Sequence, residues 1–417
     1  MDELWSCLTS LEPLFQLLGP LVDTDDGLDL RPECVLTEQS WHLFRSYAAR
    51  VRSLTYVEVY YGDRISAGLI IRALVVHPGG ILPNLRAVHW HIGEPGLSLV
   101  PAFCPPSLER MVIWLGDEDF QTDSVKRLLY GLSSSLANRL KYFEFGADSS
   151  PGTRVDLTTA LNTFLRSQSS LLELKLPNYP VQDPVTVCAV SQASSHLRTF
   201  SADVRYVPKE MFREILGVLA GRCTSLRRVW LARTGVDWGD ETICIEDIEP
   251  MLQLTLIEDA RLWLEGRLKL TAPDIRQMGQ AWQGLTSLIL YPDEGPGVPL
   301  PDLATFAQWF PALQRFAAPF DCAGYIPSAD EVSSRFKNLR RLTWLRGQIG
   351  DTQRLRVAEF LAVVLGPTAE LRIRQYGLDP DEALDETSPW EVGFENKELR
   401  DLIDVFYRVH GAINRIK

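Results

Sequence analysis

The sequence predicts an α/β solenoid, a stack of short units in which each unit adds one parallel strand to one face and one helix to the other. Three observations predict it. The motif L-x-x-Φ-x-Φ, where Φ is apolar, recurs about 11 to 12 times. Its anchors are mostly 23 to 32 residues apart, and several intervals hold a helical pattern. This period is typical of leucine-rich repeats, which curve with strands on the concave face and helices on the convex face.

Each copy of the motif reads as a strand, because its two Φ positions lie on the same face of an extended chain. In the first copy, the anchor Leu54 places Val57 and Val59 in the core. In FKNLRRLTWLRG, residues 336–347, the anchor Leu339 places Leu342 and Trp344 there. The positions between them are polar, charged or aromatic, so one face of each strand is expected in the core and the other in water.

Helical spacing of apolar residues follows several strands. It is clearest in QTDSVKRLLYGLSSSL (121–136) and KEMFREILGVLAGRC (209–223), and Thr271, Asp302 and Asp351 are expected N-caps of later helices. A doubly wound α/β fold also alternates strands and helices. The near-constant pitch and the lack of a glycine-rich phosphate loop favour the solenoid.

The chain is expected to have three parts. Residues 1–50 form an N-terminal helical cap from ELWSCLTSLEPLFQLL and EQSWHLFRSYAARV, separated by the acidic turn DTDDGLDL. Residues 51–378 form the solenoid. Residues 379–417 form an acidic loop, LDPDEALDETSPWEVG, and a C-terminal capping helix in ENKELRDLIDVFYRVHGAINRI.

Composition excludes several classes of function. The net charge of −12 argues against nucleic-acid binding over the whole surface. The sequence has no signal peptide and no apolar run long enough to span a membrane. Seven dispersed cysteines without a CxxC pair indicate reduced thiols in the cytoplasm or nucleus.

No motif for catalysis or for cofactor binding is present, so we expect no enzyme and no cofactor. An enzyme of unknown type stays open as an unfavoured alternative. His89 and His91 share a strand face, but a pair without a third ligand fits surface histidines better than a metal site.

The outward strand positions are rich in Trp, Tyr and Arg, the residue types that dominate protein interfaces. The candidate protein-binding residues on the concave face are Tyr56, Tyr60, His89, His91, Arg110, Trp114, Tyr142, Arg228, Trp230, Arg261, Trp263, Tyr291, Arg315 and Arg341. A merely solubilising role for these side chains is the alternative. The basic strip Arg227, Arg228, Arg340, Arg341 and Arg346 would favour an acidic partner, if these residues lie together.

The segments WHLFRSYAARVRSL (41–54), LPNLRAVHW, CPPSLERMVIWL, LTAPDIRQMGQAWQGLTSLIL, FPALQRFAAPF and FKNLRRLTWL resemble those of fungal F-box proteins with leucine-rich repeats, particularly those of mushroom-forming basidiomycetes. The resemblance implies repeats that capture substrates for an SCF-type ubiquitin ligase. It also implies an F-box ahead of them to dock the ligase adaptor, but no LPxE-type F-box start occurs here.

The predicted function is therefore a non-catalytic module that binds an unidentified protein ligand, similar to the substrate-recognition part of such a receptor. A genuine F-box substrate adaptor, in a longer form of the chain, is the alternative. Only that form would bind the ubiquitin-ligase adaptor.

Overall fold

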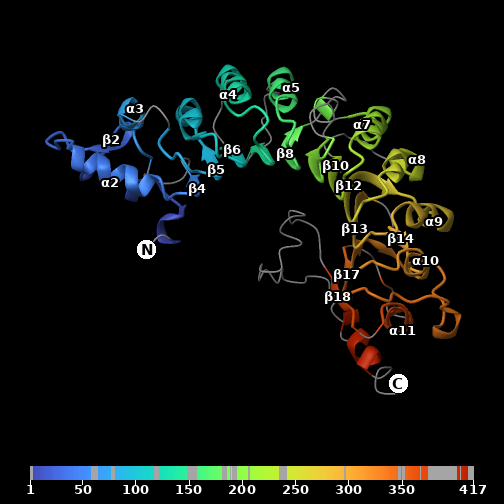
Figure 1. The fold of residues 1–417 in the computed structure, drawn as a ribbon. Coiled ribbons are helices and arrows are strands. Elements are labelled where there is room, and N and C mark those ends of the chain that lie inside the picture. The colour runs from blue at the N-terminus through green and yellow to red at the C-terminus, as the bar shows by residue number, and fades with distance from the viewer. Residues whose placement is uncertain are drawn as a thin grey trace. The chain divides into compact units, whose positions relative to one another are not determined.

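The computed structural model describes residues 3–411, apart from 58–63, 77–79, 117–121, 148–156, 181–185, 188, 190–194, 205–206, 234–241, 295–296, 346–348, 350–352, 367, 374–401 and 404. The chain divides into two compact units, unit 1 (Met1–Asp203) and unit 2 (Val204–Lys417). Each unit alternates strands with helices (Figure 1).

The elements of unit 1 are, in chain order, η1 (Glu3–Trp5), β1 (Cys7–Leu8), α1 (Glu12–Phe15), β2 (Leu21–Thr24), β3 (Gly27–Leu30), α2 (Glu38–Ala48), β4 (Ser53–Val57), α3 (Ala67–Val76), β5 (Ala87–Ile92), η2 (Glu94–Phe103), β6 (Arg110–Leu115), α4 (Thr122–Ser135), β7 (Tyr142–Ala147), α5 (Thr158–Arg166), β8 (Glu173–Pro180) and β9 (Thr199–Asp203). Its main sheet has the order β1-β4-β5-β6-β7-β8-β9, and every pair in it is parallel.

The elements of unit 2 are α7 (Lys209–Arg222), β10 (Arg228–Arg233), β11 (Thr242–Ile243), α8 (Ile245–Ile248), η3 (Glu249–Gln253), β12 (Asp259–Leu268), α9 (Ala272–Ala281), β13 (Ser287–Glu294), β14 (Val298–Pro299), α10 (Asp302–Trp309), β15 (Arg315–Ala318), β16 (Phe320–Asp321), η4 (Ala329–Glu331), β17 (Arg341–Trp344), α11 (Arg354–Val364) and β18 (Glu370–Ile373). The sheet order β10-β12-β13-β15-β17-β18 follows the chain and is again parallel.

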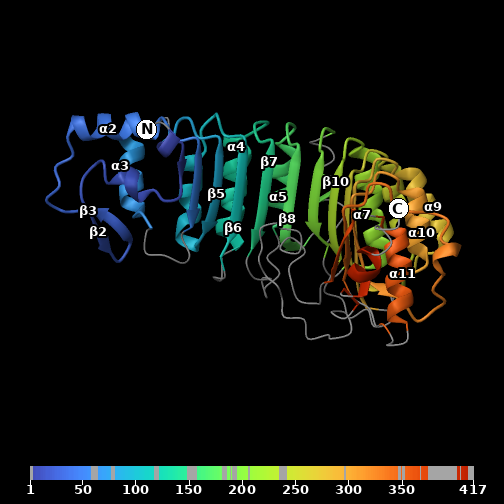
Figure 2. The ribbon, with the colours of Figure 1, turned by 90° about the horizontal axis from the view of Figure 1, so that it is seen from below.

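Helices cover one side of the strands in each unit: α4 and α5 in unit 1, and α7, α9, α10 and α11 in unit 2 (Figures 1 and 2). The opposite side is formed by alternate strand residues and is called the open face below. Sequential parallel strands, most of them joined through a described helix or 3-10 helix, form a leucine-rich-repeat solenoid, which confirms the predicted fold class.

The predicted core positions are buried from the second repeat onward. Val88 and Trp90 on β5 are 2% and 1% exposed, and Leu342 and Trp344 on β17 are both fully buried. The register carries this pattern across the sheet, since Leu342 lies opposite Phe316 on one side and Leu371 on the other. The motif therefore fixes which face of each of these strands enters the core.

The first repeat is an exception, because the motif there lies three residues earlier in the chain than predicted, and the opposite set of strand residues faces the core. Leu54 and Tyr56 of β4 lie opposite Val88 and Trp90, so Tyr56 occupies a core position and Val57 does not. Tyr56 is only 3% exposed, and its ring meets Trp90 edge to face at 5.2 Å. The buried Val51 takes the place of the anchor leucine. Val59 lies outside the described residues.

The N-terminal segment was predicted as one helix over residues 3–18, but it is broken into η1, β1 and α1. Residues Cys7 and Leu8 pair with Ser53 and Leu54, so this segment supplies the first strand of the sheet. The predicted acidic turn DTDDGLDL (23–30) is mostly strand: it contains the end of β2, a turn at Asp25 and Asp26, and all of β3, and the two strands form an antiparallel hairpin.

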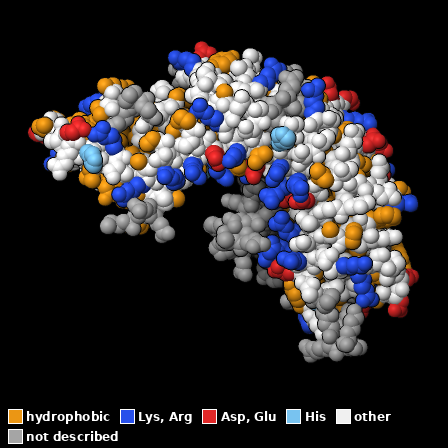
Figure 3. Space-filling model, viewed as in Figure 1, with side chains coloured by type: hydrophobic (Ala, Val, Ile, Leu, Met, Phe, Trp, Pro, Cys, Tyr) orange, Lys and Arg blue, Asp and Glu red, His pale blue; other side chains and the backbone are white. Residues whose placement is uncertain are grey.

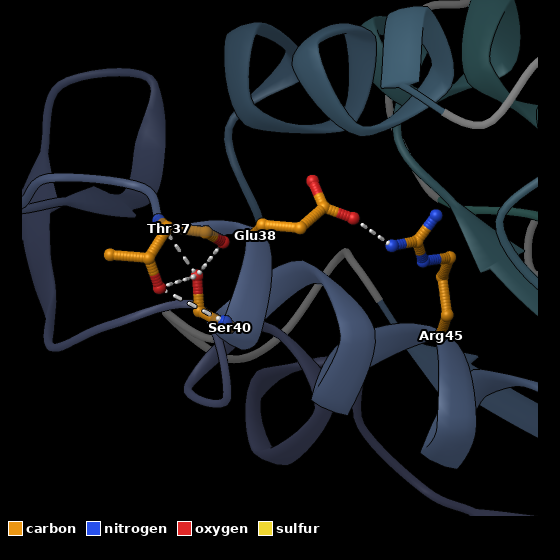
Figure 4. Close-up of polar contacts among 4 residues, drawn as sticks. All are labelled: Thr37, Glu38, Ser40 and Arg45. Carbon is orange, nitrogen blue, oxygen red and sulfur yellow. Dashed lines mark hydrogen bonds and ion pairs between the residues drawn. The ribbon is translucent and has the colours of Figure 1, made fainter.

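The second predicted N-terminal helix is α2, and a capping box starts it (Figure 4). The Thr37 hydroxyl accepts a hydrogen bond from the Ser40 backbone N–H at 3.1 Å, and the Ser40 hydroxyl accepts one from the Thr37 backbone N–H at 3.1 Å. Two otherwise unpaired donors of the first turn are thereby satisfied. Glu38 and Arg45 form an ion pair along the exposed side of the helix.

Among the other predicted caps, Thr271 is confirmed: it is the N-cap of α9 and forms a capping box with Asp274. The prediction of Asp302 as an N-cap was wrong, because Asp302 is the first residue of α10 and Pro301 is its N-cap. Asp351 lies outside the described residues. In the C-terminal segment, residues 405–411 are helical, and Phe406 is fully buried.

Candidate functional site

The open face of each unit carries most of the predicted binding residues. Of the fourteen candidates, twelve lie on described strands and alternate with core residues as expected. Tyr56 is the correction, because its side chain is buried in the core of the first repeat and its hydroxyl accepts a hydrogen bond from the Ile65 backbone N–H at 3.0 Å. Tyr60 lies outside the described residues.

In unit 1, the open-face side chains converge on the carboxylate of Glu144. The Trp114 indole N–H donates a hydrogen bond to Glu144 Oε1 at 3.0 Å, and the Tyr142 hydroxyl donates one to Oε2. The Lys175 ammonium lies 3.9 Å from the same carboxylate. The network satisfies the charge of Glu144 and fixes the two aromatic rings, so this surface is preorganised.

Arg110 and the two histidines border this network. The Arg110 guanidinium lies 3.7 Å from the centre of the Tyr142 ring, a cation–π contact that covers the tyrosine. Tyr142 is consequently only 7% exposed, and burial together with its hydrogen bond to Glu144 raises the pKa of its hydroxyl. Burial lowers the pKa of His89, and the nearby charges of His91 and Arg110 lower it further against the opposing effect of Glu144, so neutral histidine is favoured.

In unit 2, arginines from several strands lie side by side on the open face. The paired register gives one row across the strands: Arg228, Asp259, Ser287, Arg315, Arg341 and Glu370. Two residues further along the strands, a second row reads Trp230, Arg261, Ile289, Ala317, Thr343 and Arg372. Lys and Arg side chains gather on the sheet side of unit 2 in Figure 3, over β12 to β18. We call Arg228, Arg261, Arg315, Arg341 and Arg372 the arginine face.

The two carboxylates of the first row, Asp259 and Glu370, neutralise only part of the positive charge of the arginine face. Arg261 donates hydrogen bonds to Asp259 at 3.2 and 3.3 Å, and Arg315 lies 3.7 Å from the same carboxylate. Arg341 and Arg372 lie 3.6 and 2.9 Å from Glu370. The exposed Arg228 makes no hydrogen bond or ion pair with any described residue.

Aromatic side chains border the arginine face on its other side. Trp230, Trp263 and Tyr291 are each half-buried, and the rings of Trp263 and Tyr291 are 5.1 Å apart. The Trp263 indole N–H has no hydrogen-bond acceptor among the described residues. Beside Tyr291, the side chains of Ile289, Ala317 and Leu345 form a small apolar cluster.

The predicted basic strip is brought together only in part. Arg228 and Arg341 lie in one row of the open face, whereas Arg227 forms an ion pair with Glu258 just before the strands begin. Arg346 lies outside the described residues. Sequence reasoning did not single out Lys175, Asp259, Glu370 or Arg372, because it selected tryptophan, tyrosine, histidine and arginine in the clearer motif copies.

The described residues hold no group of three or more metal-ligating side chains. Burial raises the pKa of the Cys104 and Cys322 thiols to about 12 and that of Cys223 to about 11, so these thiols are poor nucleophiles near neutral pH. No helix in the described part of the chain has the length and apolar character to cross a membrane.

Comparison with known proteins found no matching family model and no matching curated protein. Among solved structures, the chain is similar to one from the complex of Rad7 and Elc1 in yeast, with 14% identity, 78% of this chain and 76% of that chain covered, and a TM-score of 0.44. It is also similar to the leucine-rich repeat-containing protein LegL7 from Legionella pneumophila, with 12% identity, 77% and 98% covered, and a TM-score of 0.37.

Proposed function

We propose that this protein is a non-catalytic interaction module that binds a protein ligand through the open face of its leucine-rich repeats. The observation that carries the proposal is the composition of that face: arginines and half-buried aromatic rings lie in registered rows in unit 2. Such side chains bury a large area and still form hydrogen bonds, so they account for most of the binding energy in protein interfaces.

The arrangement of these side chains supports binding over a merely solubilising role. Solubility requires charge, but it does not require Trp230, Trp263 and Tyr291 to share one surface with the arginines. Parallel pairing holds their backbones at fixed spacing, which limits the entropy lost on binding. The chain therefore presents a rigid surface of the kind that protein ligands recognise.

The test is capture of partners by a Trp230→Ala/Trp263→Ala double variant. The tagged protein and the variant are expressed in the native host, and bound proteins are quantified by mass spectrometry. We expect the variant to lose specifically bound proteins while its circular dichroism and thermal unfolding stay close to those of the parent. A Tyr130→Ala variant on the exposed side of α4 serves as control and keeps its partners. Unchanged capture by a folded double variant would contradict the proposal.

The resemblance to F-box proteins adds a finer proposal, in which the captured partner is a substrate for ubiquitylation. A longer form of the chain would then carry an F-box and bind the ligase adaptor. Sequencing the transcript upstream of the Met1 codon tests this. An in-frame F-box would support the finer proposal, and an in-frame stop codon with no such segment would leave the binding role alone.

A further inference from the structure

We infer that the arginine face of unit 2 binds an extended acidic peptide segment of a partner protein. This rests on the proposed function and specifies the chemistry of the ligand. The first observation is charge. The two rows of open-face residues in unit 2 contain five arginines and two carboxylates, those of Asp259 and Glu370.

This local excess of positive charge occurs on a protein whose net charge is −12. Arginine rather than lysine occupies every one of the five positions, and the planar guanidinium forms paired hydrogen bonds with carboxylates. Arg228 has no partner to give up among the described residues, and Arg341 contacts Glu370 only at 3.6 Å. These two side chains are available to a carboxylate ligand at little cost.

Apolar residues between the arginines strengthen contacts between guanidinium groups and carboxylates. Ile289 and Ala317 stand between Arg261 and Arg372 in the second row and are 8% and 4% exposed. Apolar side chains beside a charge pair reduce screening by water, so each guanidinium–carboxylate contact gains strength.

The dimensions fit a short peptide. From β10 to β18 there are five strand steps, which span roughly 24 Å at about 4.8 Å per step. An extended chain covers that distance with about seven residues at about 3.3 Å each. A segment of this length with several carboxylates could contact arginines from one end of the face to the other.

Single-stranded nucleic acid is the competing ligand, because arginines with aromatic rings also bind phosphates and bases. Two features favour the peptide. Asp259 lies within 3.7 Å of both Arg261 and Arg315 and would repel a continuous phosphate backbone. The negative charge of the whole chain opposes the approach of a polyanion more strongly than that of a short peptide.

The probe is a fluorescein-labelled peptide with the sequence LDPDEALDETSPWE, copied from residues 378–391, which contains six acidic residues and no basic one. Its fluorescence anisotropy is measured against the full chain. We expect saturable binding that weakens as salt rises from about 0.05 M to about 0.3 M. The same peptide with every Asp and Glu replaced by Asn and Gln should bind at least about tenfold more weakly.

Variants locate the binding surface. Arg228→Ala should weaken binding by about two- to fivefold, the range of an exposed charge pair, and Arg341→Ala, which removes a side chain only 17% exposed, should weaken it at least as much. The matched control Arg213→Ala removes an exposed arginine from α7, in the same unit but on its helical side, and should leave binding unchanged.

The inference is overturned by equal binding of the neutral peptide, by equal loss with Arg213→Ala, or by tighter binding of an oligothymidylate of about 12 nucleotides. A further variant replaces the acidic residues of the chain's own segment 379–386 by neutral ones. If the peptide binds only to this variant, the arginine face binds that segment of the chain, and the inference of a partner protein is contradicted. If the peptide fails while the Trp230→Ala/Trp263→Ala variant still loses its partners, this inference falls and the proposed function stands.

Discussion

The first repeat offers a sharp test of how the strands face the core. Sequence alone placed Val57 inside, whereas the structure buries Tyr56 and leaves Val57 half-exposed. Replacing each by alanine distinguishes the two registers. Tyr56→Ala removes a ring that is 3% exposed and packs on Trp90 at 5.2 Å, which by comparison with other buried aromatic residues costs about 3–5 kcal/mol.

Two milder variants separate the contributions. Tyr56→Phe keeps the ring but leaves the Ile65 backbone N–H without its acceptor, at a cost of about 1–3 kcal/mol. Val57→Ala shortens a half-exposed side chain and should cost less than about 1 kcal/mol.

Native-state hydrogen exchange is the appropriate assay, because repeat proteins unfold in parts and a single free energy of unfolding is poorly defined for them. For Tyr56→Ala, protection of the amides in β4 and β5 should fall by about a hundredfold or more, since about 1.4 kcal/mol corresponds to a factor of ten. Val57→Ala should change it by less than about tenfold. A larger effect of Val57→Ala than of Tyr56→Ala would refute the assigned register.

Three further predictions concern other parts of the chain. Gly279→Ala should lower the melting temperature, because the new methyl group would lie 2.6 Å from Trp309 Cβ, whereas Gly217→Ala on α7 meets nothing within 4 Å and should stabilise by about 0.5–1 kcal/mol. Asp247→Asn should destabilise the protein near neutral pH. Burial opposes ionisation of Asp247, but hydrogen bonds from Cys244 and Lys209 outweigh burial and lower the pKa of the carboxyl group. The stabilising charge is therefore present above about pH 4 and is lost on protonation, so the difference in stability between variant and parent should shrink as the pH falls below about 4. Iodoacetamide at about pH 8, followed by mass spectrometry, should label the exposed Cys7 in the folded protein and the buried Cys223 and Cys322 only after unfolding; early labelling of the buried pair would contradict the core assignment.

Most of the fold followed from the sequence because one leucine motif repeats with its core positions in phase. That regularity failed in the first repeat. The frame Leu54-x-x-Val57-x-Val59 matches the motif in full, whereas the frame found in the structure, Val51-x-x-Leu54-x-Tyr56, has valine at the anchor and a tyrosine that resembled an interface residue. The strand β1 was also missed, since two residues carry no detectable period.

The binding surface was only partly predictable. Its residue types follow from strand alternation, so the sequence is sufficient to place Trp230 and Trp263 on the open face. Contiguity depends on strand pairing, which places Arg228 and Arg341 in one row although 112 positions separate them in the chain. The carboxylates that partly neutralise this row, Asp259 and Glu370, could not be assigned to particular arginines without that register.

Site-specific photocrosslinking in the native host tests the central claim most directly. A photoreactive phenylalanine derivative replaces Tyr291 on the open face or, as a matched control, Tyr130 on the exposed side of α4. If the open face binds a protein ligand, Tyr291→photophenylalanine gives a discrete crosslinked product and Tyr130→photophenylalanine gives none. Crosslinks from position 130 alone would contradict the account.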